Sequence, residues 1–469
     1  MARHKNAFLL LISFFSLATA YFVVTPPNAG PEEINHAQAS WYLVENPQEL
    51  FSKSSQITYT FPSELTISNA GGYLKNLACF SQQMQIPSSC QKLEVGKKVE
   101  LTVPMLNRGN FYYLLIGLGE KLRLSGNVFQ SGKIMSFLLC LVMVALAILR
   151  LGNSIGSYAI YGPFLALTGT VVFFFSVINP NSFEIAAAFY FASSLLISTT
   201  EKVPKIGSDF HLYVSAFILA ISRSLGGVWI ISLLGFSFLI FKSVPRFKAL
   251  LFIASFGIVV NQLTGNTTYP LGEWDPPWNF YLEETVRVFN GSGDWVTSLF
   301  GTLSWSEIRL PLILVFILLT SYFFLFLNAT QPLANQRIVL FGIFIGLYLI
   351  PFFLSVVFAK NWPGWWQGRN GIPFFVGTLI LLLGREKTLN LKYPAVFIFL
   401  TNVYLLLLTF ARFNWGLYGT NTPIISNGWS LAAGTTIAFI CCFILYVFST
   451  ALFLRQTLKV TVTREYFSD

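Results

Sequence analysis

Long apolar runs separated by short polar segments make up most of the chain. About twelve of these runs are long enough, or nearly so, to cross the ~30 Å hydrocarbon layer of a bilayer as helices. They lie at roughly 7–24, 134–150, 158–177, 183–199, 209–222, 226–241, 248–264, 309–327, 338–359, 371–384, 394–411 and 431–454. The pattern predicts an all-α polytopic membrane protein with about 12 transmembrane helices.

The composition supports the same class of protein. Of the 469 residues, 54% are hydrophobic and 11% are charged, whereas about a quarter of the residues of a soluble domain are charged. The 48 Phe and 11 Trp suit lipid-facing helices and interfacial belts. We assign the net charge of +10 to the Lys and Arg that orient membrane helices. Membrane lipids are therefore expected partners, and nucleic acid is not.

The distribution of Lys and Arg predicts the orientation. With the N-terminus in the cytoplasm, basic residues concentrate at both termini and in the even-numbered connections. The short loops on the other side carry only Arg223, Lys360, Arg369 and Arg412. This positive-inside pattern places both termini in the cytoplasm. The first run ends near Ala18-Thr-Ala20, which resembles a signal-peptide cleavage site, but we expect an uncleaved span because cleavage would move the basic tail outside.

The predicted topology divides the chain into five parts. Residues 1–24 form the first, uncleaved transmembrane helix, and residues 25–132 form an extracytoplasmic segment. Residues 133–264 hold transmembrane helices two to seven, and residues 265–308 form a second extracytoplasmic loop. Residues 309–469 hold helices eight to twelve and a cytoplasmic tail.

The segment 25–132 is predicted to contain a small β-rich insertion after the first helix. Alternating, β-branched residues at 56–61, 65–68 and 99–103 predict strands. The apolar stretch 111–119 is too short to span and predicts an interfacial or re-entrant helix. Cys79 and Cys90 lie in this segment and are free to pair if it is extracytoplasmic, but the sequence leaves that disulfide open.

The stretch that follows the first run carries the densest candidate chemistry. Pro26 and Pro27 end the preceding helix, and Pro31 suits the first turn of a new one. On that new helix Glu32 and His36 are four residues apart and are expected to share a face, with Glu33 beside them. The alternative is an ordinary polar exit loop.

Polar clusters fall on one side of the predicted membrane. They are Glu32/Glu33/His36, 107–110, 179–184, 274–275, 305–307 and 362–370. A transporter more often places ionisable groups near the bilayer centre, so this one-sided arrangement favours a membrane enzyme with its site on the outer face. The Trp residues of these loops have a commoner use as headgroup anchors.

Several kinds of catalytic motif are absent. The chain contains no Walker-type loop, no His-Glu-x-x-His helix and no Gly-x-Ser-x-Gly elbow. With three His in the whole chain, a multi-His metal site is not expected, and no cofactor is assigned. The carboxylates of the outer loops leave a divalent cation open, although no ligand set stands out.

Four motifs, in order along the chain, resemble one family. They are Pro26-Pro-Asn-Ala-Gly-Pro-Glu-Glu-Ile-Asn-His36, Ile178-Asn-Pro-Asn-Ser-Phe-Glu-Ile185, Phe300-Gly-Thr-Leu-Ser-Trp-Ser-Glu-Ile-Arg-Leu-Pro311 and Trp366-Gln-Gly-Arg-Asn-Gly-Ile-Pro373. The set resembles a bacterial family of predicted multi-pass membrane proteins, domain of unknown function 2142. Two positions depart from that family's pattern, because Glu32 replaces its usual Asp and Asn370 its usual Tyr.

The resemblance implies a GT-C glycosyltransferase architecture in a bacterial inner membrane. Such enzymes carry an acidic residue in the first outer loop and use lipid-phosphate-linked sugars. It implies an integral membrane glycosyltransferase that moves a sugar from a polyprenyl-phosphate donor to a cell-envelope glycan or glycolipid acceptor on the outer face. Glu32 or Glu33 would be the general base, assisted by His36.

The expected substrate-binding residues come from the later motifs and loops. They are Arg369, Gln367, Asn179, Glu184, Trp366, Trp274 and Lys360. Arg369 is the leading candidate for the lipid phosphate because a guanidinium fork matches phosphate oxygens, and Arg412 is a weaker one. An interfacial Arg that extends to the lipid headgroups is the plainer interpretation of Arg369.

Two alternatives to catalysis stay open at this point. A non-catalytic transporter or lipid flippase of the envelope-glycan pathway would use the β-rich insertion as a docking surface. A structural envelope subunit with a degenerate site would need none of these residues for chemistry. Glu32→Gln and Glu33→Gln separate the transporter from the enzyme, and full complementation by an Arg369→Ala/Glu33→Ala double variant would favour the structural subunit.

Overall fold

A computed structural model describes most of the chain. The described residues are 2–51, 56–65, 79–81, 85–90, 98–104, 110–156, 158–200, 206–264, 277–304, 306–331, 333, 335–357, 368–384, 392–416 and 433–465. The α-helices are α1 (Ala2–Val24), α2 (Glu33–Glu45), α3 (Asn110–Leu122), α4 (Val128–Ser154), α5 (Tyr161–Ala166), α6 (Gly169–Phe175), α7 (Pro180–Thr200), α8 (Ile206–Ser222), α9 (Gly226–Phe241), α10 (Phe247–Thr264), α11 (Trp278–Asn290), α12 (Ser292–Gly301), α13 (Leu312–Thr330), α14 (Gln336–Phe344), α15 (Ile350–Val357), α16 (Ile372–Leu383), α17 (Lys392–Trp415) and α18 (Ala433–Glu465).

Short elements connect these helices. Single 3₁₀ turns are η1 (Pro47–Phe51), η2 (Ser63–Leu65), η3 (Ser88–Cys90) and η5 (Gly368–Gly371), and η4 (Ile345–Leu349) is a π-helical turn between α14 and α15. The strands are β1 (Gln56–Pro62), β2 (Lys98–Pro104), β3 (Thr302–Leu303) and β4 (Ile308–Arg309). They form two separate antiparallel pairs, β1 with β2 and β3 with β4.

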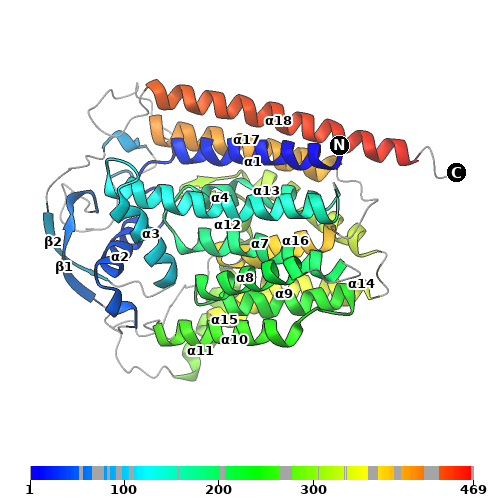
Figure 1. The fold of residues 1–469 in the computed structure, drawn as a ribbon, viewed down its shortest axis with the longest axis horizontal. Helices are drawn as coiled ribbons and strands as arrows, with labels where there is room; N and C mark the ends of the chain where they lie inside the picture. Colours follow the sequence, from blue (N-terminus) through cyan, green and yellow to red (C-terminus); the bar gives the residue numbers. More distant parts are fainter. Residues whose placement is uncertain are drawn as a thin grey trace.

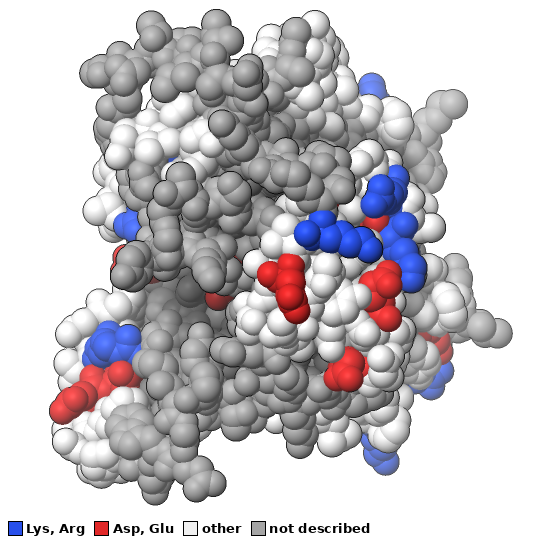
Figure 2. All heavy atoms as spheres, turned by 90° about the vertical axis from the view of Figure 1, so that its left-hand side faces the viewer, with Lys and Arg blue, Asp and Glu red and all other residues white. Residues whose placement is uncertain are grey.

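The long helices lie side by side along the longest axis of the molecule (Figure 1). The strands β1 and β2 and the helices α2 and α3 gather at one end, and both termini lie at the opposite end. Viewed from the first end, acidic and basic side chains group on the surface (Figure 2). Lys121 at the end of α3 forms an ion pair of 3.3 Å with Glu45 at the end of α2. The arrangement separates a polar end from an apolar bundle.

The bundle has the dimensions and surface of a membrane protein. Within the described ranges, seven helices are long and apolar enough to cross a bilayer. They are Lys5–Val24, Val128–Ser154, Pro180–Thr200, Leu312–Thr330, Gln336–Val357, Tyr393–Trp415 and Gly434–Gln456. Shorter apolar helices occupy Asp209–Ser222, Gly226–Phe241, Phe247–Leu263 and Gly368–Leu383. Exposed side chains such as Phe252 and Leu312 suit a surface solvated by lipid.

One predicted span differs from the prediction, and another contains an irregular turn. The run 158–177 is not one helix, because the chain turns at Leu167 and the Thr168 side chain caps the start of α6 by accepting from the Val171 N–H. Carbonyls freed by the break are satisfied from other helices, since Asn402 donates to Leu167 and Tyr322 donates to Leu165. The run 338–359 is one helical span, Gln336–Val357, with the π-turn η4 inside it, and residues 358–359 lie outside the described residues.

Within the described residues, the β-rich insertion contains one pair of strands. β1 and β2 pair antiparallel from Gln56↔Pro104 to Pro62↔Lys98, which confirms the strands predicted at 56–61 and 99–103. The third predicted strand is wrong at its start because Leu65 lies in the turn η2, and residues 66–68 fall outside the described residues. The stretch 111–119 is helical, within α3. Cys79 and Cys90 form a disulfide.

The centre of the bundle is α7. Every residue of this helix from Pro180 to Ile197 is buried, as expected for a helix with apolar residues on all of its faces. It packs against α4, α8 and α16, and the small residues Ala186, Ala187 and Ala188 permit close approach. The polar residues at its start are thereby held inside the protein, next to the stretch that follows α1.

Candidate functional site

The stretch between α1 and α2 is a compact, strained loop. Its first turn is closed by Thr25, whose hydroxyl donates to the Tyr21 carbonyl at 2.6 Å. Asn28 and Glu32 adopt left-handed backbone conformations, with φ of 65° and 57°. The helix therefore begins at Glu33, and Glu32 is its N-cap. The predicted face shared by Glu32 and His36 is wrong, because the left-handed backbone turns Glu32 out of the helix.

Glu33 is an anchor for this loop. Its side chain is buried, and its two carboxylate oxygens accept the Gly30 N–H at 3.0 Å and the Ile178 N–H at 2.9 Å. Burial raises the pKa of the Glu33 carboxyl, while the positive charge of Lys133 and the backbone N–H donors oppose the rise. Both oxygens accept backbone N–H groups, and these contacts favour the carboxylate form over the neutral acid. Glu33 thus ties the loop to the start of α7.

Lys133 was not predicted as part of this region. It is 1% exposed, donates to the Thr25 carbonyl and lies 5.0 Å from the Phe22 ring centroid. In the sequence it stands directly before the apolar run 134–150, where a Lys is normally taken for an interfacial residue. The electrostatic interaction of Lys133 with Glu33 could not be predicted, because the two residues are far apart in the sequence.

His36 faces α3. Its Nδ1 lies 2.8 Å from the Tyr113 hydroxyl, and the two rings stack with centroids 5.8 Å apart. The side chain is 4% exposed. His36 therefore fixes α2 against α3, and this geometry favours a positioning role over direct contact with a substrate.

The predicted residues Asn179 and Glu184 belong to a buried polar network. Asn179 donates to the Pro31 carbonyl at 3.2 Å, which adds a second tie between the loop and α7. Glu184 lies 3.6 Å from Arg223, and Arg223 donates to the Asn370 side chain at 2.9 Å. The network therefore runs from the loop, through the start of α7, to the turn η5 that carries Arg369.

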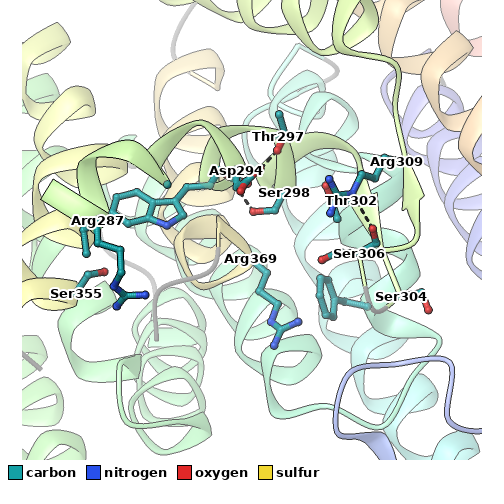
Figure 3. A pocket seen from close by; sticks show the side chains of 14 residues that line it. Arg287, Asp294, Thr297, Ser298, Thr302, Ser304, Ser306, Arg309, Ser355 and Arg369 are labelled. Carbon is teal, nitrogen blue, oxygen red and sulfur yellow. Dashed lines mark hydrogen bonds between the residues drawn. The ribbon is translucent and has the colours of Figure 1, made fainter. Parts of the chain in front are cut away.

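A polar cavity of about 290 Å³ lies beside this network. Three arginines, one aspartate and six hydroxyl side chains line it, together with Phe174, Val288, Gly291 and Trp295. The charged and hydroxyl residues are Arg287, Arg309, Arg369, Asp294, Thr297, Ser298, Thr302, Ser304, Ser306 and Ser355. Arg369 lies between Arg287 and Ser355 on one side and the residues of the β3–β4 hairpin on the other (Figure 3).

The electrostatics of the cavity favour an anion. Arg287 is bound by Glu284 through contacts of 2.9 and 3.0 Å, and the Arg309 Nε donates to the Ser306 carbonyl at 2.7 Å. Arg369 lies 6.0 Å from the Phe174 ring centroid and has only partial exposure. Three guanidinium groups against one lining carboxylate leave the cavity net positive.

The loop and the cavity share a wall. Ser304, which lines the cavity, donates to the Ala29 carbonyl at 2.7 Å. On the hairpin side of this contact, Ser304 and Ser306 have φ of 58° and 66°. On the loop side, Asn28 and Glu32 are also left-handed. Such conformations cost about 1–3 kcal/mol each and cluster at functional sites. Glu32 is outside the cavity lining, three residues from Ala29 in the same loop.

Arg412 has a different role from the one predicted. It is fully buried, and its guanidinium donates to Glu307 at 3.0 and 2.7 Å and to the Phe80 and Ile86 carbonyls at 2.6 Å each. A lipid phosphate has no access to it, so its assignment as a phosphate ligand is wrong. Arg412 instead connects the disulfide segment to the β3–β4 hairpin.

Four predicted substrate-binding residues, Gln367, Trp366, Trp274 and Lys360, lie outside the described residues. Of the predicted set, the structure brings Arg369, Asn179, Glu184, Glu33 and the Glu32 loop into one region. Arg287 and Arg309 were not predicted, although Arg309 lies within the motif 300–311. Across the part of the chain that the structure describes, no group of three or more His, Cys, Asp or Glu is placed to hold a metal ion.

These features define a membrane protein of several apolar helices, with a polar, cation-lined cavity next to the loop after its first helix. The chain belongs to the family of predicted membrane proteins known as DUF2142, whose family model matches residues 14–378. The match includes all four motifs on which the resemblance rests. No curated protein and no solved structure matches the chain.

Proposed function

We propose that this protein is an integral membrane glycosyltransferase of GT-C type. It transfers a sugar from a polyprenyl-phosphate donor to a cell-envelope acceptor on the outer face of a bacterial inner membrane. The observation that carries the proposal is the cavity lined by arginines and hydroxyls, which contacts the Glu32 loop through Ser304 and Ala29. The cavity offers the two chemistries that a sugar phosphate requires, cations for the phosphate and hydrogen-bonding groups for the sugar.

Arg369 is the proposed ligand of the lipid phosphate. The two residues beside it are held by hydrogen bonds. Arg223 donates to the Asn370 side chain, and the Gly368 N–H donates to the Ser298 hydroxyl at 2.9 Å. A guanidinium binds phosphate oxygens in a bidentate manner. Arg287 and Arg309 line the same cavity and add positive charge to it.

Glu32 is the proposed general base. Glu33 has both carboxylate oxygens occupied by backbone N–H groups, whereas Glu32 is partly exposed at the left-handed turn. In the proposed reaction an acceptor hydroxyl oxygen attacks the anomeric carbon of the donor. The bond from that carbon to the phosphate oxygen breaks, its electron pair stays on the lipid phosphate, and Glu32 takes the acceptor proton.

Charge and the fold support the proposed orientation. Lys and Arg concentrate in the termini and the even-numbered connections, which favours a cytoplasmic position for them. Both termini lie at the end of the bundle opposite β1, β2, α2 and α3 (Figure 1). The polar end, with the Glu32 loop, would then face outward, where lipid-linked sugars and envelope acceptors meet.

The test is sugar transfer by the full chain reconstituted in lipid nanodiscs. Labelled polyprenyl-phosphate sugars are offered with envelope glycans, and transferred label is counted for the wild type, for Arg369→Gln and for the exposed control Arg455→Gln. We expect transfer by the wild type and the control, and at least a tenfold loss for Arg369→Gln, because a hydrogen bond to a charged group contributes about 1.5–3 kcal/mol. The same protein is also reconstituted in sealed vesicles. Movement of the lipid across the vesicle bilayer without any sugar transfer would overturn the proposal in favour of a flippase.

A further inference from the structure

A second, apolar cavity of about 400 Å³ lies next to the polar one. Its walls come from α12, α13, α14, the π-turn η4 and the start of α16. Most of its lining is Leu, Ile, Val and Phe, and the few polar atoms include the Tyr322 hydroxyl, which already donates to the Leu165 carbonyl. The cavity therefore offers a ligand apolar contact and almost no hydrogen bonding.

The two cavities meet at a shared wall. Trp295 lines both of them. Gly368 lines the apolar cavity, and the next residue, Arg369, lines the polar one. A molecule that fills both cavities would thus have one part among cationic and hydroxyl groups and the adjoining part among apolar side chains.

The apolar cavity reaches the outer surface of the bundle between α13 and α14. Phe323 on α13 and Phe344 on α14 both line it, yet they are 58% and 48% exposed. Both helices belong to candidate membrane spans, so this surface faces hydrocarbon in a bilayer. The π-turn η4 places Leu347 and Tyr348 on the cavity wall, and π-turns in helices are frequent at functional sites.

From this geometry we infer that the two cavities together form the binding site of one anionic lipid with a single apolar chain. The chain enters sideways from the bilayer between α13 and α14 and lies in the apolar cavity. The phosphate lies on the Arg369 side of Trp295. The inference deepens the proposed function, on which it rests for the identity of the lipid as a polyprenyl phosphate.

The chemistry of the two spaces selects this occupant. An extended peptide would carry N–H and C=O groups into the apolar cavity, where an unpaired group costs several kcal/mol, in the range of about 2–7. A prenyl chain has no such groups. The net positive charge of the adjoining polar cavity then complements a phosphate at the end of that chain.

The test is photo-crosslinking to the full chain in nanodiscs. The probe is a polyprenyl monophosphate with a diazirine and an alkyne on a chain isoprene unit, and labelled peptides are identified by mass spectrometry. Variants are Leu347→Trp, which fills the cavity, and Leu347→Ala, which leaves it open. The matched control is Phe316→Trp, at a position on α13 that is 66% exposed and does not line the cavity.

We expect labels on 312–330 and 336–349, with at least a tenfold loss of labelling in Leu347→Trp and retention in Leu347→Ala and Phe316→Trp. The matching polyprenol, which lacks phosphate, should label at least tenfold less than the polyprenyl phosphate. Labels elsewhere, or equal labelling of Leu347→Trp and Phe316→Trp, would overturn the inference. The inference would also be overturned if inorganic phosphate alone abolished labelling of the wild type while Leu347→Trp was labelled normally. The prenyl chain of the probe would then contribute nothing to binding.

Sugar transfer is measured separately on the same variants. If the probe labels this cavity but no sugar is transferred, the lipid site stands and the proposed function fails. If sugar is transferred at the wild-type rate by Leu347→Trp, the lipid site fails and the proposed function stands.

Discussion

The substitution Glu33→Gln tests whether Glu33 is an anchor. The carboxylate accepts N–H groups from Gly30 at 3.0 Å and Ile178 at 2.9 Å, and it is the countercharge of Lys133. Glu33 and Lys133 are each 1% exposed. Glutamine retains one acceptor, turns an NH₂ group toward a backbone donor and leaves the Lys133 charge buried without its countercharge.

The expected cost is large because the partner charge stays in place. A buried N–H group left without its acceptor costs about 1–3 kcal/mol, and the buried Lys133 charge, which interacts electrostatically with Glu33, loses that compensation as well. The assay is denaturant unfolding of the detergent-solubilised protein, followed by Trp fluorescence. Glu32→Gln is the matched control, since the same chemical change at the preceding, partly exposed residue should stay within about 0.5 kcal/mol of the wild type.

A second variant separates lost charge pairing from poor packing. Glu33→Gln combined with Lys133→Met should recover part of the lost free energy of unfolding, because the uncompensated charge is gone. The reasoning is refuted if Glu33→Gln lies within 1 kcal/mol of Glu32→Gln. It is also refuted if the Lys133→Met change adds its full cost to that of Glu33→Gln.

Three further substitutions probe the surroundings of the site. Arg412→Met should lower the free energy of unfolding by about 3–5 kcal/mol by leaving Glu307 buried and unpaired, while the exposed control Arg455→Met changes it by less than about 0.5. Burial raises the pKa of the Glu120 carboxyl well above its usual value, so the folded state keeps its proton. The free energy of unfolding should then fall by about 1.4 kcal/mol per pH unit as the pH rises above ~4.3. Glu120→Gln should flatten that slope and be the more stable form at pH 8, and an unchanged slope would contradict this. Cys90→Ser should cost about 3 kcal/mol by opening the disulfide loop, and a reductant that destabilised this variant as much as the wild type would exclude the disulfide as the cause.

The apolar pattern predicted helices well where a run begins and ends at polar or turn residues. The run 226–241 is α9 to the residue, and 7–24 and 183–199 lie within α1 and α7. The apolar pattern failed at 158–177, where the structure has two short helices, α5 and α6, in place of one long helix. That break depends on Asn402 and Tyr322, whose side chains satisfy the freed carbonyls from far along the chain. Hydropathy carries no information about such partners.

The sequence singled out the residues of the Glu32 loop but not their separate structural contacts. Spacing singled out Glu32, Glu33 and His36 together. Ile178, 145 residues away, makes Glu33 an anchor, and Tyr113 makes His36 a packing residue. Arg287 and Arg309 join Arg369 only through the tertiary arrangement of α11 and the β3–β4 hairpin. Sequence spacing places neighbours on a helix, whereas contacts between elements require the fold.

The most direct test of the central claim is the rate of sugar transfer by Glu32→Gln. The measurement uses nanodisc-reconstituted protein, saturating labelled polyprenyl-phosphate sugar and an envelope acceptor, with the folded fraction fixed by the unfolding assay. We predict a fall of about 10²–10⁴-fold in the rate, the usual contribution of a general base, with donor crosslinking unchanged. A Glu32→Gln variant that transfers sugar at the wild-type rate would contradict the account.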